Sequence, residues 1–308
     1  MSKALFSFLV LVSAMGSFAA EGELNLPAMN PQAPAPGQRA LVTSPEYEGT
    51  SVQHQLYLPP DWSEASENAG KRWPVIVEYT GNQWAQSGSS GEVEGAALGY
   101  GLSAGKWIWV VLPYVAADHQ NNQRTWWGDE QATVEYAKRN VPRICADFGG
   151  DASKVLLCGF SRGAIAVNYI GLYDDEIAKL WCGFVSHDHY DGVREWKGTS
   201  WGDPLGLYRE SALKRLRRLK GRPVLVTQNE GTQLTQDFLK GSDFLGRFTF
   251  LDVPVQKIFP DIPKGKVIHP HTDLWMFVDS EARRRAWAWA ESVIQENTIS
   301  GNEAKSER

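Results

Sequence analysis

A serine between two glycines is the strongest chemical signal in this sequence. Gly159, Ser161 and Gly163 stand in the run Val155-Leu-Leu-Cys-Gly-Phe-Ser-Arg-Gly163, which a stretch rich in Ala, Ile and Val follows. A G-x-S-x-G pattern between an apolar strand and a helix predicts a sharp turn with the serine at its apex. Glycine is needed on both sides because a side chain there would collide with the strand or the helix. The expected chemistry is attack of the Ser161 hydroxyl on a carbonyl carbon.

Such a hydroxyl needs a base, because it is a poor nucleophile at neutral pH. Among the six histidines, His271 fits best. It follows the last predicted strand, at 267–268, and precedes the predicted C-terminal helix. Its neighbour His269 is the alternative.

A carboxylate must then orient the imidazole. We choose Glu230, which follows the predicted strand at 224–226, and we keep Asp188 and Asp191, after the preceding strand, as alternatives. Two histidines, His187 and His189, share the loop with these aspartates and raise the question of a metal site. No third ligand stands at a clear spacing, so neither a metal nor a cofactor is predicted.

Strands and helices alternate through the chain and position these groups. A half-buried strand is predicted at 52–58, and apolar runs predict further strands at 75–77, 107–112, 155–158, 182–185, 224–226 and 267–268. Helices are predicted at 129–145, 162–173, 211–220 and 280–295. This alternation predicts an α/β fold: one mostly parallel central sheet with helices on both faces.

The chain resembles the α/β-hydrolase family over most of its length. The shared parts are the turn Gly159-Phe-Ser-Arg-Gly163, the strand ending in Glu78-Tyr-Thr-Gly-Asn82, and the late histidine. The resemblance is greatest to secreted esterases and to prolyl-oligopeptidase-type catalytic domains. It implies a serine hydrolase that cleaves carboxylic esters through an acyl-enzyme, with the triad order serine, acid, histidine. A small serine peptidase of the prolyl-oligopeptidase type and a catalytically inactive binding protein on the same scaffold are the alternatives.

Acyl transfer also needs donors for the oxyanion. The backbone N–H of Arg162 is one candidate, and the loop with Gly81 and Asn82 is expected to supply the second. Loops rich in Trp and Gly surround this centre. From them we select Trp84, Trp127 and His189 as substrate-binding residues.

The chain termini and the composition bound the remaining questions. A charged residue, an apolar run and small residues predict a signal peptide at 1–19, hence a secreted or periplasmic protein. A Pro-rich linker is expected at 20–40, one hydrolase domain at 41–296 and a flexible tail at 297–308. The net charge of −5 argues against nucleic acid as a partner, and no later apolar run is long enough to span a membrane. The expected partner is a small-molecule or polysaccharide-linked ester, and the sequence leaves the oligomeric state and any pairing of the three cysteines open.

Overall fold

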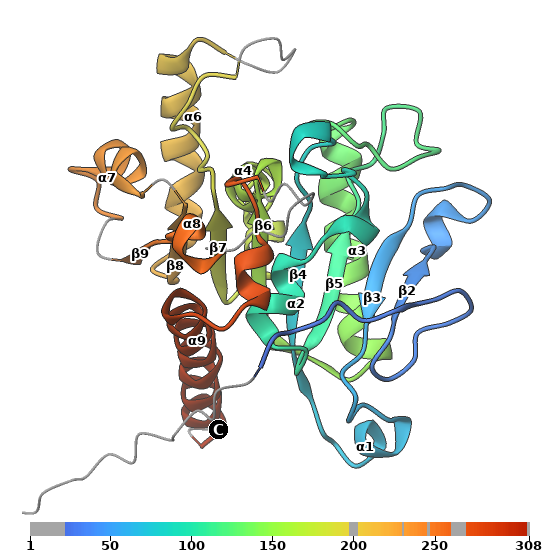
Figure 1. The fold of residues 1–308 in the computed structure, drawn as a ribbon. Helices are drawn as coiled ribbons and strands as arrows, with labels where there is room; N and C mark the ends of the chain where they lie inside the picture. The colour runs from blue at the N-terminus through green and yellow to red at the C-terminus, as the bar shows by residue number, and fades with distance from the viewer. Residues whose placement is uncertain (1–21, 197–202, 230, 245–246, 260–268, 307–308) are drawn as a thin grey trace, which may run out of the picture.

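A nine-stranded, mostly parallel sheet forms the centre of the described molecule (Figure 1). The computed structural model describes residues 22–196, 203–229, 231–244, 247–259 and 269–306. The strands lie in the order β1-β2-β3-β5-β4-β6-β7-β8-β9. Their bounds are β1 Met29–Asn30, β2 Arg39–Val42, β3 His54–Tyr57, β4 Trp73–Tyr79, β5 Ile108–Leu112, β6 Gly150–Phe160, β7 Gly183–His187, β8 Val224–Gln228 and β9 Phe248–Asp252. Among the described strands, β3 runs antiparallel to both of its neighbours, β2 and β5, and the other pairs are parallel.

Helices cover both faces of this sheet (Figure 1). They are α1 Glu64–Asn68, α2 Leu98–Ser103, α3 Glu130–Asp147, α4 Arg162–Tyr169, α5 Asp175–Ala178, α6 Leu205–Leu216, α7 Gln233–Leu239, α8 Val255–Ile258 and α9 Glu281–Ser306. Buried residues of α3, α4 and α6 share one apolar core, and those of α2 and α9 share the other. The prediction of a mostly parallel sheet between two helical layers is therefore confirmed.

Alternation along the central strands explains why two cores form. In β4, Val75 and Val77 pack into the core with α3 and α4, whereas Ile76 packs into the core with α2 and α9. All three side chains are fully buried. Strands that are buried on both faces read as continuous apolar runs, and this is why the sequence located β4 to β8.

Two predicted boundaries are wrong. The segment expected to be a linker at 20–40 contains β1 and the start of β2, and the backbone N–H of Leu24 donates to the carbonyl of Phe277. The tail expected from 297 continues α9 to Ser306. The expected signal peptide at 1–19 and the expected strand at 267–268 lie outside the described residues. The sequence did not identify β9, which pairs parallel to β8.

Candidate active site

Ser161 occupies a strained turn between β6 and α4. Its φ of 58° lies in the left-handed region, where a residue with a side chain is uncommon and strained. A Cβ on Gly159 would collide with the carbonyl of Gly163, and a Cβ on Gly163 would collide with the carbonyl of Tyr79. Both glycines are therefore required for β4, β6 and α4 to approach each other. The turn is also held from the neighbouring strand, because the N–H of Ser161 donates to the carbonyl of His187 at 3.0 Å.

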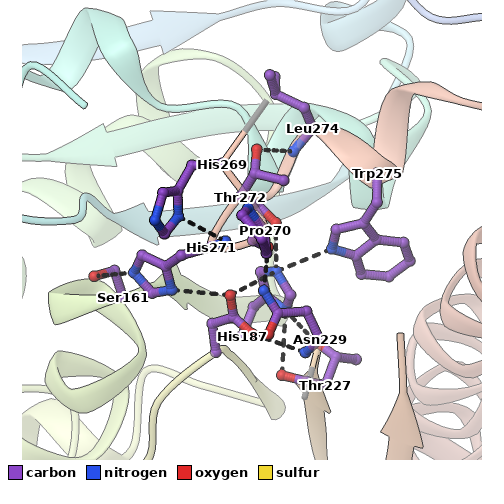
Figure 2. A network of polar contacts seen from close by, with 11 residues as sticks. Ser161, His187, Thr227, Asn229, His269, Pro270, His271, Thr272, Leu274 and Trp275 are labelled. Carbon is purple, nitrogen blue, oxygen red and sulfur yellow. Dashed lines mark hydrogen bonds and ion pairs between the residues drawn. The ribbon is translucent and has the colours of Figure 1, made fainter. Parts of the chain in front are cut away.

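His271 lies between the serine and a carboxylate. Its Nε2 is 2.8 Å from the Oγ of Ser161 (Figure 2), and its Nδ1 is 2.9 Å from Oδ2 of Asp188. Hydrogen-bonded contacts of this length allow proton transfer from the hydroxyl to the imidazole. His269, the alternative base, accepts the backbone N–H of His271 at its Nδ1 instead, at 3.0 Å.

Asp188 follows β7 directly and is buried, with 8% of its surface exposed. Burial by itself raises the pKa of its carboxyl, but the imidazoles of His187 and His271 and the N–H of Asn229 outweigh burial and lower the pKa below its ordinary value. The N–H of Asn229 donates to Oδ1 at 2.8 Å. Asp188 is therefore held ionised, as a carboxylate that orients an imidazole must be.

Of the two other acid candidates, the structure describes only Asp191, which pairs with a different group. Asp191 forms a two-pronged ion pair with Arg215, at 2.8 and 3.0 Å, so its expected alternative role as the acid is wrong. Glu230 lies outside the described residues.

A cavity of about 330 Å³ opens at Ser161 and His271. Mostly apolar and aromatic surface lines it, contributed by Trp84, Trp126, Trp196, His189, Asn82 and Arg162. His189 packs edge-on against Trp196, with ring centroids 4.7 Å apart. Burial lowers the pKa of His189 to about 3, so this ring is neutral near pH 7. The structure thus brings two of the predicted substrate-binding residues, Trp84 and His189, to the cavity.

Trp127 does not line the cavity, so its prediction as a substrate-binding residue is wrong. It is 2% exposed and stacks on Tyr169 within the core, with ring centroids 4.9 Å apart. Its neighbour Trp126 takes the place at the cavity, together with Trp196. Trp126 has a φ of 53°, so the backbone turns between the two indoles, and no sequence signal indicates which of them faces the cavity.

The loop expected to supply an oxyanion donor lies against the nucleophile. A Cβ on Gly81 would be 3.2 Å from the Cβ of Ser161. Asn82 lines the cavity, and its Oδ1 accepts the N–H of Trp126 at 2.7 Å. Arg162 is the first residue of α4, where a backbone N–H has no partner within the helix. These positions agree with donors on two sides of the serine hydroxyl.

The side chain of Arg162 turns inward rather than toward substrate. It is 1% exposed and lies over the ring of Tyr114, with 3.9 Å from its guanidinium carbon to the ring centroid. It donates to the carbonyls of Gly81 at 2.9 Å and Trp126 at 2.6 Å. Burial lowers its pKa to about 10, so it stays charged near pH 7. The cation thereby ties the loop at Gly81 to the loop at Trp126.

A second, polar cavity of about 160 Å³ lies on another side of His271. Its lining includes two buried acids, Glu78 and Asp273, which the sequence analysis did not identify. Burial, together with the nearby Asp273, raises the pKa of Glu78 to about 8. Three donors face its carboxyl group: the N–H groups of Leu98 and Gly99 and the indole of Trp109.

Neither a metal site nor a membrane-spanning helix is found among the described residues. No group of three or more His, Cys, Asp or Glu side chains is placed to hold a metal ion among these residues. Within the same part of the chain, no helix combines the length and the apolar character that a membrane crossing requires.

Comparison with known proteins gives structural matches only. No protein-family profile and no curated protein sequence matches the chain. One of two fungal esterases from Rhizomucor miehei is similar with a TM-score of 0.51 and 13% identity, over 85% of this chain and 84% of that one. An esterase of Pyrobaculum calidifontis has a TM-score of 0.49 and 16% sequence identity, over 85% of this chain and 87% of that one. A thermophilic carboxylesterase from a metagenomic library has a TM-score of 0.48 and 15% identity, over 85% of this chain and 90% of that one. The strand order, the two helical layers and the turn at Ser161, together with the match to the fungal enzyme, show that this chain has the α/β-hydrolase fold.

Proposed function

We propose that the protein is a serine hydrolase of carboxylic esters, with Ser161, His271 and Asp188 as its catalytic triad. One observation carries this proposal: His271 contacts the serine hydroxyl through one ring nitrogen and a buried carboxylate through the other. Such an arrangement supports nucleophilic catalysis rather than a passive binding role, because each group has the partner that its step requires.

The proposed reaction proceeds in two halves. Ser161 attacks the ester carbonyl while His271 takes the hydroxyl proton, and His271 then gives that proton to the departing alcohol. Water, activated by the same imidazole, releases the acid from the acyl-enzyme. The N–H of Arg162 and an N–H at Gly81 or Asn82 are the proposed donors to the oxyanion. Asp188 stabilises the imidazolium that forms in each half.

The cavity at Ser161 supports an uncharged, planar substrate group next to the ester. Its walls are mainly indoles, its half-buried His189 is neutral, and the Arg162 guanidinium is turned toward backbone carbonyls. A charged group would lose its hydration there without gaining a partner. An aromatic ring would instead stack against Trp126 or Trp196. We therefore propose esters with an aryl group on one side of the carbonyl as the preferred substrates.

Steady-state hydrolysis tests the proposal. Wild type is expected to cleave methyl 3-phenylpropanoate and p-nitrophenyl acyl esters, and Ser161→Ala to lose turnover while the fold, followed by circular dichroism, is retained. Aminoacyl-proline anilides are assayed in parallel. Faster cleavage of the anilides would favour the peptidase alternative. Unchanged ester turnover in Ser161→Ala would overturn the proposed function.

A further inference from the structure

We propose that His187 is a positioning residue, which holds the segment carrying His271 in place through a hydrogen bond from its Nε2–H to the carbonyl of Thr272. The inference rests on the proposed function, since it concerns the geometry of the same triad. His187 contacts neither the serine hydroxyl nor the cavity at Ser161, so any effect on turnover must pass through other residues.

His187 is the last residue of β7 and is completely buried. Its backbone already joins both halves of the site. Its carbonyl accepts the N–H of Ser161 at 3.0 Å, and the next residue is Asp188. Its ring stacks on that of Phe160 at an interplanar angle of 27°, with centroids 5.5 Å apart, and this contact restricts its tilt.

The side chain contacts four groups of three residues in two other segments (Figure 2). Nε2 lies 2.8 Å from the carbonyl oxygen of Thr272, and the indole N–H of Trp275 approaches the same nitrogen at 3.0 Å. Nδ1 lies 2.9 Å from Oγ1 of Thr227 and 3.2 Å from its carbonyl oxygen. A fully buried imidazole therefore connects the end of β8 to the residue that follows His271.

These contacts cannot all be hydrogen bonds at once. A carbonyl only accepts and an indole N–H only donates, so Nε2 serves either Thr272 or Trp275. With the proton on Nε2, the ring donates to Thr272 and its Nδ1 accepts from the hydroxyl of Thr227. With the proton on Nδ1, Nε2 accepts from Trp275 and the carbonyl of Thr272 loses its donor. The Thr227 hydroxyl can donate or accept, so its contact with Nδ1 fits both tautomers. The contact of Nε2 with the Thr272 carbonyl, at 2.8 Å, is shorter than its contact with the Trp275 indole, at 3.0 Å, and we assign the first tautomer to the resting site.

A second hydrogen bond acts on the other side of His271. The side-chain amide of Asn229 donates to the carbonyl of Pro270, and the N–H of Asn229 donates to Asp188 (Figure 2). The residue before His271 is thus attached to the end of β8, and the residue after it to the end of β7, which Asp188 follows. Without the donor from His187, the attachment of Thr272 is lost while that of Pro270 to Asn229 remains, and the imidazole can rotate away from the serine. A displacement of about 1 Å can lower catalysis on the order of 10²-fold.

Two amide substitutions separate positioning from simple structural support. Glutamine can place a donor near the position of Nε2, whereas asparagine is shorter and ends near Nδ1. His187→Gln is therefore expected to retain most of the wild-type kcat, and His187→Asn to lower kcat roughly 10- to 100-fold at little change in KM. Both variants leave a polar group without its full set of partners, so a purely structural role predicts similar losses of stability and of activity in both.

Thr227 provides a second test that keeps the histidine. Thr227→Val removes the hydroxyl that donates to Nδ1 and leaves the carbonyl there as an acceptor, so the proton is expected to move to Nδ1 and kcat to fall. Thr227→Ser keeps the hydroxyl and is the matched control. Nitrogen-15 chemical shifts of the His187 ring report the tautomer directly, whether or not a substrate is known.

The outcomes are distinguishable. The inference holds if His187 carries its proton on Nε2 in wild type and if kcat falls in His187→Asn and Thr227→Val but not in His187→Gln and Thr227→Ser. It is overturned if wild type carries the proton on Nδ1, or if the asparagine and glutamine variants lose kcat equally. A wild-type protein whose turnover does not depend on Ser161 overturns the proposed function instead, and the tautomer measurement still decides the hydrogen bond to Thr272.

Discussion

Asp188 Oδ2 lies 2.9 Å from Nδ1 of His271, although 83 residues separate them in the chain. The contact fixes the tautomer in which Nε2 can accept the proton of Ser161. Asp188→Asn is therefore expected to lower kcat by about 10⁴, with a much smaller change in KM.

The matched control is Asp191→Asn, three residues further along the same loop. This change breaks the ion pair with the partly buried Arg215, so we expect a lower melting temperature and near-normal kcat in assays kept well below it. Equal losses of kcat in the two variants would contradict the assignment of Asp188.

The aromatic cavity predicts a substrate-dependent effect of Trp126. Trp126→Ala is expected to raise KM for methyl 3-phenylpropanoate roughly fivefold, because one aromatic contact contributes about 1 kcal/mol. KM for methyl propanoate, which lacks the ring, should change little. Trp127→Phe is the control, since Trp127 packs in the core on Tyr169. A uniform change in KM for both esters would argue against an aryl-binding wall at Trp126.

The turn at the nucleophile predicts a stability difference between two glycine substitutions. Gly163→Ala is expected to destabilise the protein severely, because its Cβ would overlap the carbonyl of Tyr79. Gly206→Ala, in the exposed first turn of α6 with no atom within 4 Å of a built Cβ, is expected to be neutral or stabilising by about 0.5–1 kcal/mol. Urea unfolding measures both. A Gly163→Ala protein as stable as wild type would disprove the close packing of β4 on α4.

Glu78 predicts a pH-dependent contribution to stability. Its pKa rises from 4.5 when exposed to about 8 in the fold, so the folded state binds more protons than the unfolded state between these values. The contribution of the protonated group is fully present below about 4.5 and declines as the pH rises toward about 8. Its loss across this window is on the order of a few kcal/mol.

Glu78→Gln removes the titration while keeping an acceptor for Gly99 and Trp109. The free energy of unfolding of wild type minus that of the variant should therefore be larger at about pH 5 than at about pH 8. Because His54 and His189 titrate in both proteins, their effects cancel in this difference. A difference that does not vary with pH would contradict the raised pKa.

Local features explain what the sequence could predict. Burial on both faces gives the central strands continuous apolar runs. Gly159 and Gly163 pack against backbone, so both positions require glycine, and this gives the recognisable G-x-S-x-G pattern around Ser161. The choice of His271 succeeded in locating the imidazole that contacts Ser161, because only one histidine pair stands between the last strands and α9.

The identity of the carboxylate that contacts His271 could not be predicted from a local pattern, because the contact joins residues far apart in the chain. The strand at 224–226 favours Glu230, which lies outside the described residues, whereas the described carboxylate at His271 belongs to Asp188, one strand earlier. Asp188 has a φ of 70°, in the left-handed region, and no feature of the neighbouring sequence predicts this backbone conformation. The sequence could not distinguish Trp126 from Trp127 for a similar reason: the left-handed backbone at Trp126, with a φ of 53°, places one indole at the cavity and the next in the core.

The most direct test of the account is reaction of the folded protein with a fluorophosphonate, followed by peptide mapping. The phosphonate reports a serine that a base has activated, so we predict a single adduct on Ser161 that is lost in Ser161→Ala and strongly slowed in Asp188→Asn but not in Asp191→Asn. An adduct on another residue, or no adduct on the folded wild-type protein, would contradict the central claim.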